Sequence, residues 1–310
     1  RSLNMWESWE TNEKMDNWDN VVLWEEGMDG YTPEKAGRVK FARFSTFGTK
    51  EGLPFEVQYL TAADELVFFS NTNWTTFDLS TGEYITKLGQ LRRLTISGYG
   101  LVDLDPDFKN LKNLESLDIS VNNFEKIPEV LTKENFPKLH ALYLNTCQRG
   151  VIYDLSNTTT THFGGLFEET DQTREFPRRL LEWDNLDTLT LSVNYLQGRI
   201  PDMKDYAQKY TQADISAADS LPQALVGTPK VLPNIKRFSI NQNRLTGELP
   251  EWLLHHPALD WMDPFTLVFT QEGKDQDGKL AGFTNEPVNL DEYYRFYEGK
   301  KYLDPNKKEE

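Results

Sequence analysis

The stretch Leu114-Glu115-Ser116-Leu117-Asp118-Ile119-Ser120-Val121-Asn122 decides the fold of this chain. It has the pattern L-x-x-L-x-L-x-x-N, in which the last two apolar positions lie two residues apart. On a β-strand, side chains two residues apart point to the same face, so this spacing predicts a short strand with one buried face. The side chains between and beside these apolar residues then point to the opposite face.

The same pattern recurs along most of the chain at intervals of 23 to 28 residues, apart from two intervals of 47 and 49 residues. Self-similarity at this period predicts a stack of coils that share one continuous core. The pattern resembles that of the leucine-rich repeat family. The fold implied is an α/β leucine-rich repeat solenoid, a curved right-handed superhelix with a parallel concave β-sheet and caps at both ends. The second apolar residues of the successive copies are Ala42, Leu66, Leu94, Leu117, Leu142, Leu189, Phe238 and Met262.

Five copies of the pattern end with an asparagine or a cysteine, placed where the chain leaves the strand. An asparagine amide turned inward there can pair with buried backbone groups of neighbouring coils, which otherwise cost about 1 to 3 kcal/mol each. Cys147 is the only cysteine of the chain, and its place in this series predicts a buried packing residue rather than a nucleophile. The predicted structural ladder consists of Asn71, Asn122, Cys147, Asn194 and Asn243.

The two long intervals predict insertions near residues 148–180 and 202–232. For the second interval a degenerate coil is an equally open alternative, because Tyr210, Ala213 and Ile215 fall at the expected register. In the first interval a run of threonines favours a loop over a hidden coil. Such insertions in a repeat array are often binding elements, and a tolerated surface insertion without a role is an equally open alternative. The predicted organisation is an N-terminal tryptophan-rich cap at 1–36, a solenoid at 37–265, and a C-terminal hairpin cap with a polar tail at 266–310.

Both ends of the array carry segments that could cover its exposed core. At the N-terminal end, five of the eight tryptophans lie in the first quarter of the chain. At the C-terminal end, the apolar segments 265–269 and 280–283 flank a glycine-containing turn, which predicts a closing hairpin.

Two copies of the pattern continue as Leu196-Gln197-Gly198-Arg199-Ile200-Pro201 and Leu245-Thr246-Gly247-Glu248-Leu249-Pro250. This L-x-G-x-I-P ending resembles the plant-type subclass of leucine-rich repeats, which also occurs in surface proteins of Gram-negative bacteria. That subclass often has a capping segment with tryptophans that ends in G-R-V, matched here by Trp18, Trp24 and Gly37-Arg38-Val39, although the cap's paired cysteines are absent. The resemblance implies an exported bacterial cell-surface or outer-membrane lipoprotein with a lipid anchor upstream of Arg1, while a cytoplasmic location stays open.

The composition and motifs of the chain exclude several classes of partner and activity. The formal charge of −16 at pH 7, from 49 acidic and 33 basic residues, repels the phosphates of nucleic acids. No stretch approaches the roughly 18 consecutive apolar residues of a transmembrane helix. The four histidines, His140, His162, His255 and His256, lie in no recognisable nucleophile, zinc or phosphate motif. We therefore expect no enzyme activity, no metal, no cofactor, no nucleic acid and no transmembrane segment.

Strand alternation determines which residues lie on the concave face. Large aromatic and arginine residues gather at its two ends, around a middle of mostly serine, threonine and asparagine. Tyr, Trp and Arg supply most interface hot spots, which favours a non-catalytic recognition or scaffold protein that binds a protein partner. A cell-surface glycan-binding protein and a structural spacer of a larger envelope protein are the alternatives, since serine and threonine are also common on solvated strands. The candidate ligand-binding residues are Phe41, Arg43, Phe69, Arg93, Asp118, Tyr143, Asn145, Arg237, Asn241 and Trp261.

Overall fold

The computed structural model describes residues 8–9, 12–44, 55–69, 82–99, 101, 103–122, 124, 126–146, 175–217, 221, 223–254, 256–259, 271, 273–274 and 278–285. The chain divides into two compact units, unit 1 from Arg1 to Thr170 and unit 2 from Asp171 to Glu310. Each unit has its own strands and its own buried apolar residues.

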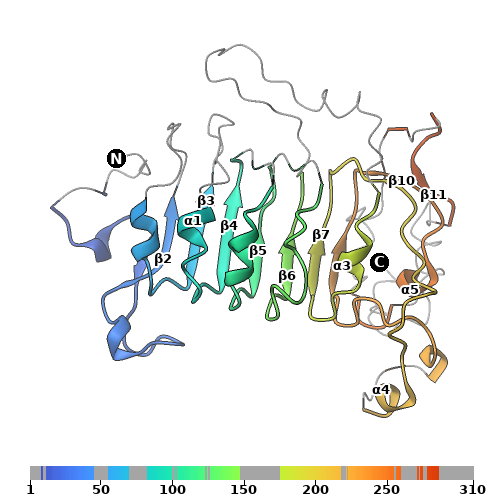
Figure 1. The fold of residues 1–310 in the computed structure, drawn as a ribbon, viewed down its shortest axis with the longest axis horizontal. Helices are drawn as coiled ribbons and strands as arrows, with labels where there is room; N and C mark the ends of the chain where they lie inside the picture. The colour runs from blue at the N-terminus through green and yellow to red at the C-terminus, as the bar shows by residue number, and fades with distance from the viewer. Residues whose placement is uncertain are drawn as a thin grey trace, which may run out of the picture. The chain divides into compact units, whose positions relative to one another are not determined.

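Unit 1 is built on a parallel sheet whose strands run side by side in chain order (Figure 1). These strands are β2 (Val39–Phe44), β3 (Glu65–Phe69), β4 (Arg93–Ser97), β5 (Ser116–Asp118) and β6 (Ala141–Tyr143). The second apolar residues of the repeats pair across the sheet one after another, from Ala42 through Leu66, Leu94 and Leu117 to Leu142. The strand register predicted from the repeat is therefore confirmed in this unit.

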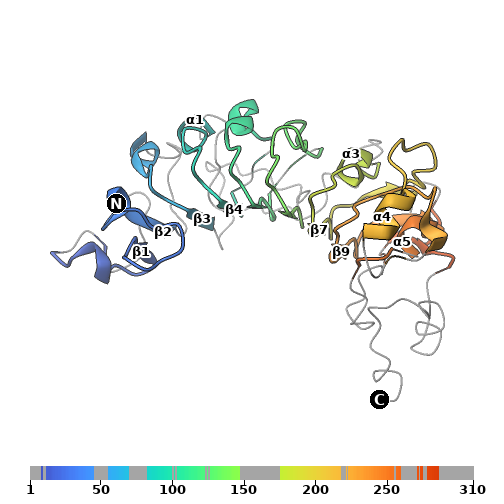
Figure 2. The same ribbon diagram turned by 90° about the horizontal axis from the view of Figure 1, so that it is seen from below.

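The return halves of three coils carry a short helical turn on the side opposite the strands (Figure 2). These turns are η3 (Phe55–Tyr59), α1 (Gly82–Ile85) and η5 (Pro106–Asn110). Each directs an apolar side chain inward, and Val57, Ile85 and Phe108 are all buried. Because the strands bury their own leucines on the same side, each coil completes one layer of the core. A fully buried Leu, Val or Phe contributes about 1.5 to 3 kcal/mol relative to an exposed one.

The N-terminal end of unit 1 is covered by turns that carry tryptophans. Trp24 is 2% exposed, and its indole Nε1 donates a hydrogen bond of 2.8 Å to the carbonyl of Ala62. Trp9 stacks on Trp18 and meets Phe44 edge-on. These contacts place aromatic rings next to the first parallel strand, where the stack of coils begins. The elements here are η1 (Met15–Asn17), η2 (Pro33–Lys35) and β1 (Val21–Leu23), which pairs antiparallel with β2.

Unit 2 contains two further parallel strands of the repeat, β7 (Thr188–Thr190) and β9 (Arg237–Ser239). They pair directly, with Leu189 opposite Phe238. The coil of β7 also includes α3 (Arg178–Leu181), in which Leu180 and Leu181 are buried. The boundary near residue 180 that the sequence suggests for the first insertion therefore falls inside this coil.

Residues 202–232 lie between β7 and β9 and have hydrogen bonds of their own. The N–H of Tyr210 donates to the carbonyl of Thr228 (3.0 Å), and the N–H of Gly227 donates to the carbonyl of Tyr210 (2.8 Å). The loop closed in this way carries α4 (Gln212–Ala217) and η6 (Gln223–Leu225). Ala213 and Ile215 lie on α4 and are not buried. The alternative of a hidden coil at this register is therefore wrong, because so short an apolar spacing fits a helix as well as a strand.

A second, small parallel sheet joins the two L-x-G-x-I-P endings to a third strand. Its strands are β8 (Gln197–Gly198), β10 (Arg244–Gly247) and β11 (Gly282–Phe283), with β10 in the middle, and α5 (Glu251–Leu254) follows β10. Gly198 and Gly247 have φ angles of +77° and +87°, a region that other residues rarely adopt. A Cβ at Gly247 would also lie 3.0 Å from the side chain of Arg199. The glycine of the pattern is therefore required by the backbone here.

The predicted C-terminal hairpin falls only partly within the described residues. Lys274 and Leu280 form an antiparallel bridge, and the chain then continues into β11, which pairs in parallel with β10. The segment 265–269 lies outside the described residues. So do Met262, residues 147–174 of the first predicted insertion, and the tail from residue 286 onward.

Candidate functional site

The candidate functional surface in unit 1 is the side of the sheet that points away from the core, which we call the open face. The strand register places the residues of the open face, the predicted site residues of this unit among them, in three rows across β2 to β6. The first row is Phe41, Glu65, Arg93, Ser116 and Ala141. The second is Arg43, Val67, Thr95, Asp118 and Tyr143, and the third is Phe69, Ser97, Ser120 and Asn145.

One end of the open face, on β2 and β3, holds large side chains. The guanidinium carbon of Arg43 lies 5.0 Å from the centre of the Phe69 ring, a cation–π contact worth about 0.5 to 1 kcal/mol where it is exposed. Phe41 lies on the same face of β2, two residues before Arg43. All three side chains are half-buried, so each keeps part of its surface in solvent.

The middle of the open face carries short polar side chains. Ser97 and Ser120 are buried between their neighbours, while Thr95 and Ser116 are partly exposed. The carboxylate of Asp118 accepts the N–H of Ser120 at 2.9 Å, and the N–H of Asn145 donates to the Ser120 hydroxyl at 3.1 Å. These bonds connect the residues that follow β5 and β6. Tyr143 lies on β6, the last strand of unit 1, and so forms the other end of the open face of this unit.

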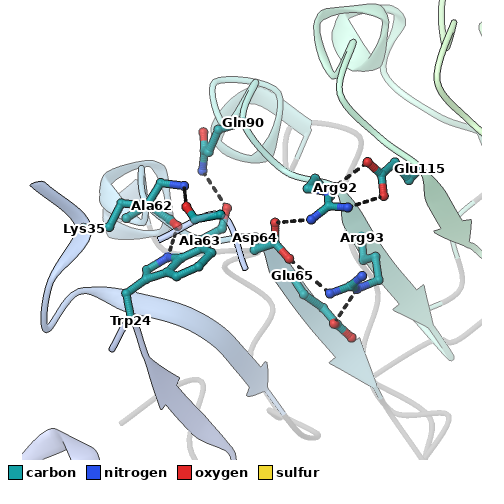
Figure 3. A network of polar contacts seen from close by, with 11 residues as sticks. Trp24, Lys35, Ala62, Ala63, Asp64, Glu65, Gln90, Arg92, Arg93 and Glu115 are labelled. Atoms are coloured by element: carbon teal, nitrogen blue, oxygen red, sulfur yellow. Dashed lines mark hydrogen bonds and ion pairs between the residues drawn. The ribbon is translucent and has the colours of Figure 1, made fainter. Parts of the chain in front are cut away.

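Arg93 is engaged in ion pairs within the chain. Its Nε donates to Glu65 at 2.8 Å and its Nη2 to Asp64 at 3.1 Å, as Figure 3 shows. Both carboxylates lie on the preceding coil. The charge of Arg93 is thus already compensated, so the structure gives this predicted binding residue a role in joining two coils.

Arg92, the neighbour of Arg93, forms a matching link to the next coil. Its Nε and Nη2 donate to the two carboxylate oxygens of Glu115, at 2.9 and 2.8 Å (Figure 3). This bidentate pair of hydrogen bonds raises the pKa of the Arg92 guanidinium and lowers the pKa of the Glu115 carboxyl. The polar edge where the strands begin is therefore a series of links between successive coils.

The remaining predicted residues belong to unit 2 or lie outside the described residues. Arg237 is exposed on β9. The side-chain oxygen of Asn241 accepts from the hydroxyls of Ser192 and Ser239. Trp261 lies outside the described part of the chain, so the residues that unit 1 brings together are those of β2 to β6.

Asn122 and Asn243 each bond to the backbone of two coils. Asn122 is fully buried; its oxygen accepts the N–H groups of Tyr99 and Leu101, both at 3.2 Å, and its amide nitrogen donates to Ile96 and Ile119 carbonyls at 2.8 Å. Asn243 makes the corresponding bonds in unit 2, and the backbone N–H of the buried Asn194 is one of its donors. Asn71 and Cys147 lie outside the described residues.

The sequence of one coil also matches a family model. Residues 113–133 match the family described as Leucine Rich Repeat. The chain has a leucine-rich repeat fold. No curated protein matches it.

Several solved structures are similar to this chain at low sequence identity. The Arabidopsis receptor kinase HAESA, solved with the peptide hormone IDA and the co-receptor SERK1, has a TM-score of 0.46 and 18% identity, over 85% of this chain and 38% of that chain. A leucine-rich repeat protein of Leptospira interrogans has a TM-score of 0.46 and 16% identity, over 83% and 54%. A plant ice-binding protein has a TM-score of 0.45 and 18% identity, over 87% and 79%. The chain spans between 24% and 38% of the lengths of three matching plant receptor ectodomains.

A second series of amides, which the repeat pattern did not predict, also links neighbouring coils. The amides of Gln90, Asn113 and Asn234 donate to backbone carbonyls of the preceding coil at 2.8 to 3.1 Å. Each stands directly before the first apolar residue of its repeat. An Asn or Gln directly before the first apolar residue, as in Asn113-Leu114, is therefore a sequence signal for this hydrogen bond.

Gln271 extends the buried ladder in unit 2. Its oxygen accepts the N–H of Leu245 at 3.1 Å, and its nitrogen donates to the carbonyl of Ile240 at 3.0 Å. It is a glutamine, and it follows Met262 at a spacing that the repeat does not predict. The repeat pattern therefore does not predict its place in the ladder.

His256 is a buried packing residue. Its Nδ1 accepts the N–H groups of Ala258 and Leu259 at 3.2 and 3.1 Å, and its Nε2 lies 3.1 and 3.0 Å from the carbonyls of Val231 and Leu232. Both ring nitrogens are thus occupied by backbone groups. Among the described residues, no cluster of three His, Cys, Asp or Glu side chains could hold a metal ion. A search of the same residues finds no helix that is long and apolar enough to cross a membrane.

Proposed function

We propose that this leucine-rich repeat protein is a non-catalytic recognition protein that binds an extended segment of a protein partner on the open face of unit 1. The observation that carries this proposal is the distribution of side-chain size across that face. Phe41, Arg43 and Phe69 lie at one end and Tyr143 on the last strand, β6. On β4 and β5 between them, every side chain of this face except the ion-paired Arg93 is short and polar.

The dimensions of this face suit an extended peptide. Neighbouring strands lie about 4.8 Å apart, so the four steps from β2 to β6 cover about 19 Å. An extended chain advances about 3.3 Å per residue, so a segment of about six residues reaches from Phe41 to Tyr143. Large residues at the two ends can then anchor partner side chains, since aromatic residues and Arg dominate interface hot spots. The partly exposed hydroxyls of Thr95 and Ser116 can pair with the partner's backbone between these anchors.

The test uses a random peptide library displayed on phage, selected on the immobilised chain. We expect enriched peptides whose affinity falls about tenfold or more in each of the variants Phe41→Ala and Tyr143→Ala, because each removes a hot-spot ring. The matched control is Lys109→Ala on η5, which lies on the opposite side of the unit and should bind as the wild type does. Thermal unfolding of each variant shows whether it is folded. Failure to enrich any peptide, or enriched peptides that bind all variants equally, would contradict the proposal.

A further inference from the structure

Two aromatic rings stand out on the outer side of unit 1, away from the open face. Phe55 and Tyr59 are the first and last residues of η3, and they are 50% and 65% exposed. Their ring centres lie 6.2 Å apart with planes at 79°. Both rings therefore present apolar surface to solvent at one place.

The repeat itself does not require these rings. η5, two turns further along the outer side, is also a five-residue 3₁₀ helix, and its central residue Phe108 is buried as Val57 is in η3. The positions that correspond to Phe55 and Tyr59 are the exposed Pro106 and Asn110. The coil thus needs an apolar side chain in the centre of the turn and none at its ends.

Polar groups are held beside the two rings. The ammonium of Lys87 donates to the side-chain oxygen of Gln58 at 3.0 Å, and it lies 3.9 Å from the carboxylate of Glu83. Because that bond uses the oxygen of Gln58, the two amide N–H groups of Gln58 are the part left to donate to a ligand. The carboxylates of Glu56 and Glu83 are exposed in the same region and supply acceptors.

We propose that Phe55, Gln58 and Tyr59 form a binding site for a neutral saccharide. A sugar ring has an apolar C–H face, which can lie against an aromatic ring, and hydroxyls at its rim, which can pair with an amide and with carboxylates. Two half-exposed rings offer at most a few hundred Å² of surface. A stable protein interface needs about 800 Å² from each partner, so the size of this patch favours a small ligand. The carboxylates of Glu56 and Glu83 outnumber the single ammonium of Lys87 there, and this net negative charge disfavours an anionic sugar.

The test measures binding of four neutral hexasaccharides, cellohexaose, maltohexaose, mannohexaose and chitohexaose, by isothermal titration calorimetry with the purified chain. At least one should bind, and the double variant Phe55→Ala/Tyr59→Ala should weaken it about tenfold or more, because the variant removes both rings against which the sugar would lie. Tyr59→Phe keeps the ring and should retain most of the affinity. The matched control Pro106→Ala/Asn110→Ala alters the equivalent positions of η5 and should bind as the wild type does.

The outcomes separate this site from the open face. Absence of binding by all four hexasaccharides at millimolar concentration overturns the proposal. Equal binding by the wild type and by a folded Phe55→Ala/Tyr59→Ala variant also overturns it. Loss of saccharide affinity in Tyr143→Ala but not in the η3 variant would place the sugar on the open face and likewise overturn it.

Discussion

The guanidinium of Arg92 and the carboxylate of Glu115 lie on neighbouring coils and share two hydrogen bonds of 2.9 and 2.8 Å. The same two residues are also joined through the backbone, because the carbonyl of Arg92 accepts the N–H of Glu115 at 2.7 Å. The side-chain pair therefore reinforces the point at which β4 and β5 begin to pair.

The Arg92–Glu115 pair predicts a specific dependence of stability on pH. The folded protein lowers the pKa of Glu115 below its ordinary value of 4.5, so the carboxylate stabilises the fold fully above that value. This stabilisation is lost as the pH falls below 4.5 through the lowered folded pKa. Chemical denaturation across this range should show a steeper loss of stability in the wild type than in Glu115→Gln. Parallel curves would contradict the role assigned to this pair.

Asn122 should be among the most sensitive polar residues of unit 1. Asn122→Ala leaves the N–H groups of Tyr99 and Leu101 and two carbonyls without their partner, and each buried group costs about 1 to 3 kcal/mol. We expect a loss of at least about 2 kcal/mol in the free energy of unfolding, measured by urea denaturation. Asn110→Ala, at an exposed position of η5, is the control and should change stability by less than about 0.5 kcal/mol. Equal effects of the two changes would mean that Asn122 does not occupy a buried ladder position and that the repeats are misaligned.

Gln271 should act as a ladder residue although it departs from the repeat. Gln271→Ala removes the partner of one N–H and one carbonyl in unit 2 and should destabilise that unit by about 1 to 3 kcal/mol. Hydrogen exchange at Leu245 gives a local measure and should become faster. The control is Gln208→Ala, whose side chain is exposed. Unchanged exchange at Leu245 would argue against this bond.

Trp24 should be essential for the N-terminal end of unit 1. Trp24→Ala removes a side chain that is 2% exposed, and such changes cost about 3 to 5 kcal/mol. Trp24→Phe keeps most of the ring but loses the bond to Ala62, so we expect a smaller loss. Tyr59→Ala, at a 65% exposed position, should leave the midpoint of thermal unfolding almost unchanged. A silent Trp24→Ala would show that these turns do not stabilise the coils.

The sequence predicted the parts of this fold that depend on period alone. Even the weak copy around Ala42 lies in register with Leu66, because parallel strands in a stack repeat the same alternation. The hidden coil at Tyr210, Ala213 and Ile215 was wrong because a few apolar residues cannot distinguish a strand from a helical turn.

The candidate site was harder to predict from the sequence than the fold was. The register placed Arg93 on the open face, but its pairing with Asp64 and Glu65 depends on side-chain conformation. The opposite charges of Glu65 and Arg93 on adjacent strands were a signal that could have suggested this pairing. Phe55 and Tyr59 lie outside the repeat motif, so only the exposure of their rings in the structure draws attention to them.

The most direct test of the open face is a map of the bound peptide. Backbone NMR spectra of the chain would be recorded with and without a peptide selected on it. The account predicts that the shifts which change most belong to β2 to β6, including Thr95, Ser116 and Tyr143, while η3, α1 and η5 stay unchanged. Changes confined to those outer turns, with β2 to β6 unaffected, would contradict it.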